Sequence, residues 1–93
     1  MIRKDVMTKT WGNKEIVTSP FDGIVKKIMT KAKNRIYEWE PLLAIQTDDG
    51  AVVQISVGIS GIIEKFTVSE GDRVIPGTVL AYIDDDLLVT GSD

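Results

Sequence analysis

The sequence repeats itself with an offset of 38 residues, and this regularity limits the possible fold more than any other feature. Residues 21–28 align with residues 59–66, and the alignment continues without a gap. The identical pairs are Gly23/Gly61, Ile24/Ile62, Lys27/Lys65, Arg35/Arg73, Leu42/Leu80, Ile45/Ile83 and Asp48/Asp86. Two copies of a unit that cannot bury its own apolar face are expected to pack together about a pseudo-twofold axis. A solenoid would need more copies.

The apolar residues have the spacing of β-strands. Residues 53–60 alternate between apolar and polar, which gives a strand with one apolar face. Strands are also expected at 16–19, 23–29, 42–47, 61–68 and 79–84, with brief ones near 35–37 and 73–75. Residues 26–33 have some helical tendency but lack caps, so we interpret them as a strand followed by a loop.

A hairpin should join the two halves. Asp49-Gly50 lies between the apolar runs 42–45 and 52–55, and glycine accepts the positive φ of a tight turn. Pro, Gly, Asp and Ser mark further turns at 19–23, 69–72 and 76–77. Short strands with closely spaced turns predict a small all-β sandwich or flattened barrel.

The apolar pattern also predicts the core. We expect the following side chains to be largely buried: Ile24, Val25, Ile28, Leu42, Ile45, Ile55, Val57, Ile62, Ile63, Phe66, Val74, Leu80 and Ile83. Gly23 and Gly61 should occupy equivalent sites at strand starts, where the backbone approaches another segment closely or needs special dihedral angles.

The composition excludes several kinds of chemistry. The chain has no cysteine and no histidine, so it lacks disulfides, thiolate metal sites and imidazole acid/base catalysis. We therefore predict that it is not an enzyme. The acidic runs 48–49 and 84–86 lack the spaced ligands of a calcium loop, so we interpret them as solvated turn acids rather than a metal site.

The chain of 93 residues is expected to form one domain. Its start has charges without a following apolar segment, and no run approaches the roughly eighteen apolar residues of a membrane span. We therefore expect a cytoplasmic protein that does not bind membranes. The net charge of −3 further predicts that it does not bind nucleic acid. The domain should cover 15–86, with half-repeats at 17–48 and 55–86. Segments 1–14 and 87–93 should be loose, unless 87–89 pairs with a sheet edge.

Two glycine-containing motifs resemble the biotinyl/lipoyl carrier domain family. Residues 19–25 contain a Pro-x-x-Gly-x-Val pattern, and residues 70–80 contain Gly-Asp-x-Val-x-x-Gly-x-x-Leu. The resemblance covers roughly residues 15–86. It implies a barrel-sandwich hybrid, which is a flattened barrel of two four-stranded antiparallel sheets related by a pseudo-twofold axis.

The resemblance also implies an acceptor lysine at the hairpin tip, where the family attaches biotin or lipoate as an amide. Here residues 47–51 read Thr-Asp-Asp-Gly-Ala. Matching Thr-Asp places the acceptor position at Asp49, and counting back from Gly61 places it at Gly50. No lysine lies between Lys33 and Lys65, so we expect no cofactor. The tip is also too short for the long helical hairpin of the membrane-fusion relatives.

Two functions remain open from the sequence. The first is a non-enzymatic interaction or structural module that keeps the carrier fold without its acceptor. The alternative is a swinging-arm biotin or lipoyl carrier in a carboxylase or dehydrogenase complex, modified at a lysine outside the hairpin. We expect an unidentified protein partner and a monomer or weak oligomer.

Two segments are candidates for partner contact. Trp39 stands where the second half has Gly77, so its ring should be partly exposed and suited to an interface. The open alternative is that it packs on the amino-terminal segment around Trp11. The basic loop containing Lys31, Lys33 and Arg35 could contact an acidic partner, or could be a solvated loop with Asn34 in the left-handed conformation.

Overall fold

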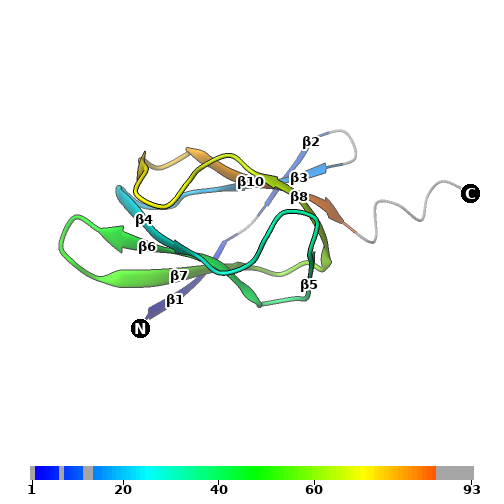
Figure 1. Ribbon diagram of the computed structural model, residues 1–93, viewed down its shortest axis with the longest axis horizontal. Coiled ribbons are helices and arrows are strands. Elements are labelled where there is room, and N and C mark those ends of the chain that lie inside the picture. Colours follow the sequence, from blue (N-terminus) through cyan, green and yellow to red (C-terminus); the bar gives the residue numbers. More distant parts are fainter. Residues whose placement is uncertain (1, 7, 12–13, 86–93) are drawn as a thin grey trace, which may run out of the picture.

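The computed structural model describes residues 2–6, 8–11 and 14–85, and it consists of two five-stranded sheets packed face to face (Figure 1). One sheet has the order β1-β7-β6-β4-β9, and the other has the order β2-β3-β10-β8-β5. The strands are β1 (Ile2–Val6), β2 (Lys9–Trp11), β3 (Lys14–Thr18), β4 (Gly23–Ile28), β5 (Arg35–Ile36), β6 (Pro41–Thr47), β7 (Val52–Val57), β8 (Gly61–Phe66), β9 (Arg73–Val74) and β10 (Val79–Asp85). The all-β prediction is confirmed, and no helix in the described part of the chain could span a membrane.

The two halves pair their strands in the same register. In the β4–β6 pair, Gly23 lies opposite Thr47; in the β8–β10 pair, Gly61 lies opposite Asp85. Each of these partners is 38 residues from its counterpart. The bulges also correspond, since the pairing with β6 skips Lys26 in β4 and the pairing with β10 skips Glu64 in β8. Equivalent residues therefore occupy equivalent places in the two sheets.

The amino-terminal segment is not loose where the structure describes it, so this expectation was wrong. β1 pairs parallel with β7, while β2 pairs antiparallel with β3, which adds one strand to each predicted four-stranded sheet. Without them, β7 and β3 would expose unpaired backbone groups along sheet edges. The expected loose segment 87–93 lies outside the described residues.

Polar side chains fasten these added strands. Ser56 Oγ donates to Asp5 Oδ1 at 2.8 Å, which holds β1 against β7. The Glu15 carboxylate is buried and accepts hydrogen bonds from the hydroxyls of Thr8 and Thr10, the latter at 2.7 Å. A buried carboxylate needs such donors, because burial without hydrogen bonds is costly.

The core lies between the two sheets and contains most of the predicted side chains. The buried ones are Val25, Leu42, Ile45, Ile55, Val57, Ile63, Val74, Leu80 and Ile83, and the partly buried ones are Ile28, Ile62 and Phe66. The prediction for Ile24 was wrong, since 40% of its surface is exposed. Successive side chains of a strand face opposite ways, so Ile24 faces outward because Val25 faces the core. Val17, Ile36, Leu43, Ala44, Val53 and Ala81 are buried members that the prediction omitted.

Gly23 is required by a close backbone contact at the start of β4. A Cβ atom at this position would lie 2.3 Å from the carbonyl oxygen of Gln46 in the neighbouring strand. Gly23 is not among the glycines with positive φ. Gly61 is also buried and begins β8 in the equivalent register.

Candidate functional site

The β6–β7 hairpin closes as a tight turn at the position where the resemblance places the acceptor. The Thr47 amide donates to the Ala51 carbonyl at 2.7 Å, and the Gly50 amide donates to the Thr47 carbonyl at 2.9 Å. Gly50 has a φ of 92°, a conformation that glycine adopts without steric cost. Gly50 thus supplies the turn geometry predicted from Asp49-Gly50.

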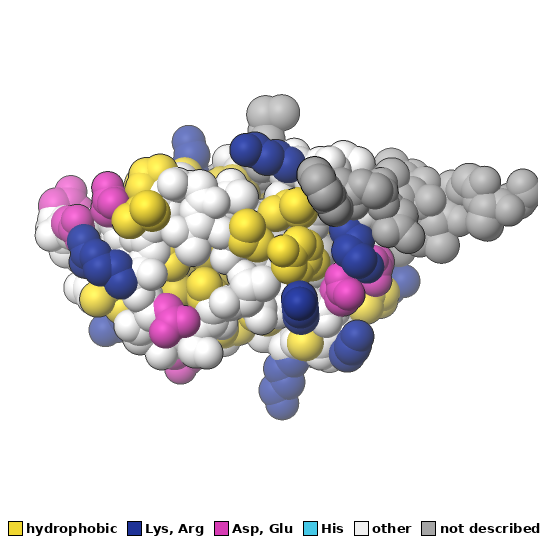
Figure 2. All heavy atoms as spheres, turned by 90° about the horizontal axis from the view of Figure 1, so that it is seen from above, with side chains coloured by type: hydrophobic (Ala, Val, Ile, Leu, Met, Phe, Trp, Pro, Cys, Tyr) yellow, Lys and Arg dark blue, Asp and Glu magenta, His cyan; other side chains and the backbone are white. Residues whose placement is uncertain are grey.

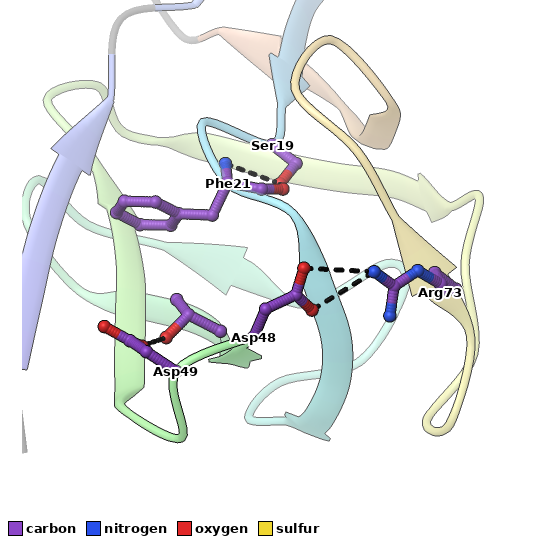
Figure 3. A network of polar contacts seen from close by, with 6 residues as sticks. Ser19, Phe21, Asp48, Asp49 and Arg73 are labelled. Atoms are coloured by element: carbon purple, nitrogen blue, oxygen red, sulfur yellow. Dashed lines mark hydrogen bonds and ion pairs between the residues drawn. The ribbon is translucent and has the colours of Figure 1, made fainter.

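The Asp49 carboxylate folds back onto its own turn. The Thr47 hydroxyl donates to Asp49 Oδ1 (Figure 3). The Ala51 amide approaches the same oxygen at 3.4 Å. These donors, the Thr47 hydroxyl first and then the Ala51 amide, lower the pKa of Asp49 below its ordinary value of 3.8. Asp49, one of the two candidate acceptor positions, is thus a carboxylate bonded to its own turn.

The neighbouring Asp48 pairs with an arginine from the other half of the chain. Arg73 Nη2 lies 3.1 Å from both carboxylate oxygens of Asp48 (Figure 3). Arg73 belongs to β9, which pairs with β4 beside the hairpin. Both side chains are more than half exposed, so an isolated pair of this kind contributes roughly 0.2–1 kcal/mol. Its main effect is to direct Asp48 toward β9.

A shallow depression of about 490 Å³ lies beside the tip. Phe21, Ala51 and Val53 supply its apolar lining, and Asp22 is among its acidic residues. Ser19 Oγ fixes the Phe21 turn, since it donates to the Phe21 carbonyl at 2.8 Å and accepts from the Phe21 amide at 3.2 Å. Figure 2 shows acidic side chains gathered at this end of the molecule, beside a basic one.

At the hairpin end of the molecule, the described residues supply carboxylates and hydroxyls, but the tip has no amine. Among them, no three His, Cys, Asp or Glu side chains come together as a group that could hold a metal ion. Asp84 of the second acidic run instead pairs with Lys14 at 3.1 Å, and Asp86 lies outside the described residues. The tip can therefore present anions and an apolar surface, but no nucleophilic nitrogen.

The predicted partner-contact residues lie elsewhere, around β5. In Figure 1 the hairpin loop lies at the left end of the molecule and β5 lies toward the right. Lys31, Lys33 and Arg35 are exposed in and after the loop that precedes β5, and Trp39 follows β5 with 47% of its surface exposed. Trp39 lies beside Val6 and Thr8 of the amino-terminal segment, whereas the side chain of Trp11 is not described.

The left-handed residue of the basic loop is Lys33, with a φ of 75°, so the assignment of this role to Asn34 was wrong. The loop keeps the 38-residue register, and Lys33 falls where the second half has Gly71, whose φ is 96°. The backbone of Asn34 is used differently, because its amide donates to the Lys31 carbonyl at 3.2 Å.

No family model and no curated protein matches this sequence. Solved structures do match it. The lipoyl domain of the 2-oxoglutarate dehydrogenase complex from Azotobacter vinelandii matches with a TM-score of 0.65 and 26% identity over 73% of this chain and 92% of that domain. The chain has the fold of the biotinyl/lipoyl carrier domain family. The urea carboxylase of Kluyveromyces lactis has a TM-score of 0.72 at 18% identity, over 89% of this chain but only 7% of that protein.

Within this carrier fold, sequence reasoning found the hairpin but missed its polar contacts. The Asp49 contact could have been recognised, because an aspartate in a turn often accepts the backbone amide two residues on, as Asp49 does from Ala51. Arg73 gave no local signal, since its contact with Asp48 depends on the pairing of β9 with β4.

Proposed function

We propose that this domain is a non-enzymatic interaction or structural module that keeps the carrier fold but is not modified at its hairpin. The observation that carries the proposal is the hairpin tip, where an Asp49 carboxylate bonded to its own turn and a Gly50 in the left-handed conformation occupy the two candidate acceptor positions.

The chemistry of attachment supports this proposal. Biotin and lipoate join a carrier through an amide, which needs an amine as nucleophile. A carboxylate cannot form that bond, and the Asp49 carboxylate is already bonded to the Thr47 hydroxyl and the Ala51 amide of its own turn. The lysines nearest in sequence are Lys33 and Lys65, and neither belongs to the hairpin.

The amino-acid composition argues against an enzyme. Without cysteine or histidine, the usual activated nucleophiles and imidazole bases are missing from the chain. The protein would act through its surface, and we place the partner contact at Trp39, Lys31, Lys33 and Arg35. We further propose a cytoplasmic monomer or weak oligomer that binds a protein rather than nucleic acid or a membrane.

Intact-mass measurement tests the proposal. The protein is expressed in cells with active biotin and lipoate ligases, and its mass should equal that of the unmodified chain. A mass increased by a biotinyl or lipoyl group would favour the alternative, a swinging-arm carrier modified at a lysine outside the hairpin. Peptide mapping would then identify that lysine.

A further inference from the structure

Two turns of the first half hold bulky side chains where the second half has glycine. Lys33 and Trp39 are the described non-glycine residues with positive φ, at 75° and 67°. Their counterparts 38 residues later are Gly71 and Gly77, with φ values of 96° and 94°. A left-handed conformation is sterically unfavourable for a residue with a Cβ atom. Since glycine serves both turns in the second half, the backbone alone does not explain these two side chains.

The indole of Trp39 packs against a position that only glycine can occupy without moving the ring. It lies over Gly58, where a Cβ atom would be 2.6 Å from the ring. The ring forms one wall of a groove of about 230 Å³, together with Val6, Thr8 and Ile59. This volume lies below the roughly 300–1,000 Å³ of small-molecule sites. Because the lining is mainly apolar, the groove suits a single apolar side chain.

The positive charge near β5 lies in the basic loop that precedes it, while two exposed acids, Glu38 and Glu40, flank Trp39 after it. Lys31, Lys33 and Arg35 are exposed before the Trp39 turn. The acid Glu40 turns toward its own loop, where its Oε1 accepts the Tyr37 amide at 2.9 Å, and Glu38 is the remaining acid of the turn. A partner that fits this surface carries carboxylates next to an apolar residue.

We propose that Lys33 and Trp39 recognise an acidic protein segment, with one apolar side chain of that segment in the Trp39 groove and its carboxylates against the basic loop. The inference rests on the proposed interaction function and adds the chemistry of the partner. Strained residues persist where the surrounding structure fixes them, and they occur often at binding sites. A nucleic acid is the less favoured occupant, because the net charge of the chain is −3.

Fluorescence anisotropy with defined probes tests the proposal. The probe is a labelled short peptide that alternates Glu or Asp with Leu and Phe. Controls are the same peptide with Gln and Asn replacing the acids, a Lys-containing version and a single-stranded oligonucleotide. Saturable binding should be strongest for the acidic peptide, about tenfold weaker for the amide version, and weaker at high salt. Equal binding of all peptides, preferential binding of the oligonucleotide, or no saturable binding of the acidic peptide would overturn the proposal.

Glycine substitutions separate recognition from folding. Lys33→Gly and Trp39→Gly should each weaken acidic-peptide binding several-fold, while Lys33→Gly leaves the unfolding midpoint unchanged or raised, because glycine relieves the unfavourable φ. Lys27→Ala, which removes an exposed cation from β4, is the matched control and should bind normally. Normal binding by both glycine variants would contradict the proposal. If the acidic peptide does not bind and the wild-type mass is that of the unmodified chain, only this inference is refuted. If the wild-type protein carries biotin or lipoate, the proposed function itself is refuted.

Discussion

The indole of Trp39 lies so close to Gly58 that a Cβ atom at position 58 would be 2.6 Å from the ring. Gly58→Ala should therefore displace the indole. Because Trp39 is half exposed, the ring can move outward, and we expect a loss of about 1–2 kcal/mol in the free energy of unfolding. Urea denaturation gives the loss, and a red shift of Trp39 emission in a Trp11→Phe background reports the displacement.

The double variant Gly58→Ala/Trp39→Gly is the control for this prediction. Without the indole, alanine at position 58 should cost much less, which a double-mutant cycle records as a coupling between the two residues. Additive losses would show that the indole does not depend on Gly58.

Gly23→Ala should destabilise the domain more than Gly50→Ala. At Gly23 the new Cβ atom would meet the Gln46 carbonyl oxygen at 2.3 Å, and that backbone belongs to a paired strand that cannot move freely. At Gly50 nothing lies within 4 Å, so only the φ of 92° opposes alanine, at roughly 1–2 kcal/mol. We expect about 3 kcal/mol or more for Gly23→Ala by denaturant titration. Equal losses for the two variants would contradict the close contact.

Thr47→Val should raise the pKa of Asp49 toward its ordinary value, because the Thr47 hydroxyl is the main cause of the lowering. A carboxyl whose pKa is lowered in the folded state stabilises that state at any pH above its unfolded pKa of about 4. This contribution is lost as the pH falls through the pKa of the folded state. Thr47→Val should therefore lose less stability than wild type on acidification. NMR titration of the Asp49 carboxyl measures both pKa values. Identical values in the two proteins would show that the hydroxyl does not act on Asp49.

Much of the fold followed from local patterns. The alternation in residues 53–60 and the Asp49-Gly50 turn depend on residues close in sequence, and the structure places strands and the hairpin accordingly. The 38-residue offset is visible when the sequence is aligned with itself. The added strands were missed because β1 and β2 carry mixed charges, and their pairing is stabilised by contacts such as Asp5 with Ser56. Such contacts join segments distant in sequence and leave no periodic signal.

The surface residues show a second limit of sequence reasoning. Asn34 was expected in the left-handed conformation because asparagine tolerates it, yet the repeat register imposes that conformation on Lys33. Ile24 was expected inside because it is apolar, yet strand alternation turns it outward beside the buried Val25. In both cases position in the fold outweighed residue type.

Asp49→Lys should restore an ε-amine near the acceptor position. Asp49 is a better site than Gly50 because the Gly50 φ of 92° disfavours a side chain. The turn bonds of Thr47 and Gly50 use backbone groups and should survive the change. We expect partial modification, by the lipoyl pathway before the biotin pathway, since Asp48 precedes the site and no methionine flanks it. Intact mass gives the modified fraction, and Gly50→Lys, which should be modified less, is the matched variant.

The most direct test is the intact mass of the wild-type protein made in the same cells as Asp49→Lys, with both ligases active. The variant shows whether the ligases recognise this fold, and the wild type shows whether the natural chain is an acceptor. We predict a wild-type mass equal to that of the unmodified sequence beside a partly modified variant. A wild-type mass increased by one biotinyl or lipoyl group would contradict the account, because the domain would then be a carrier.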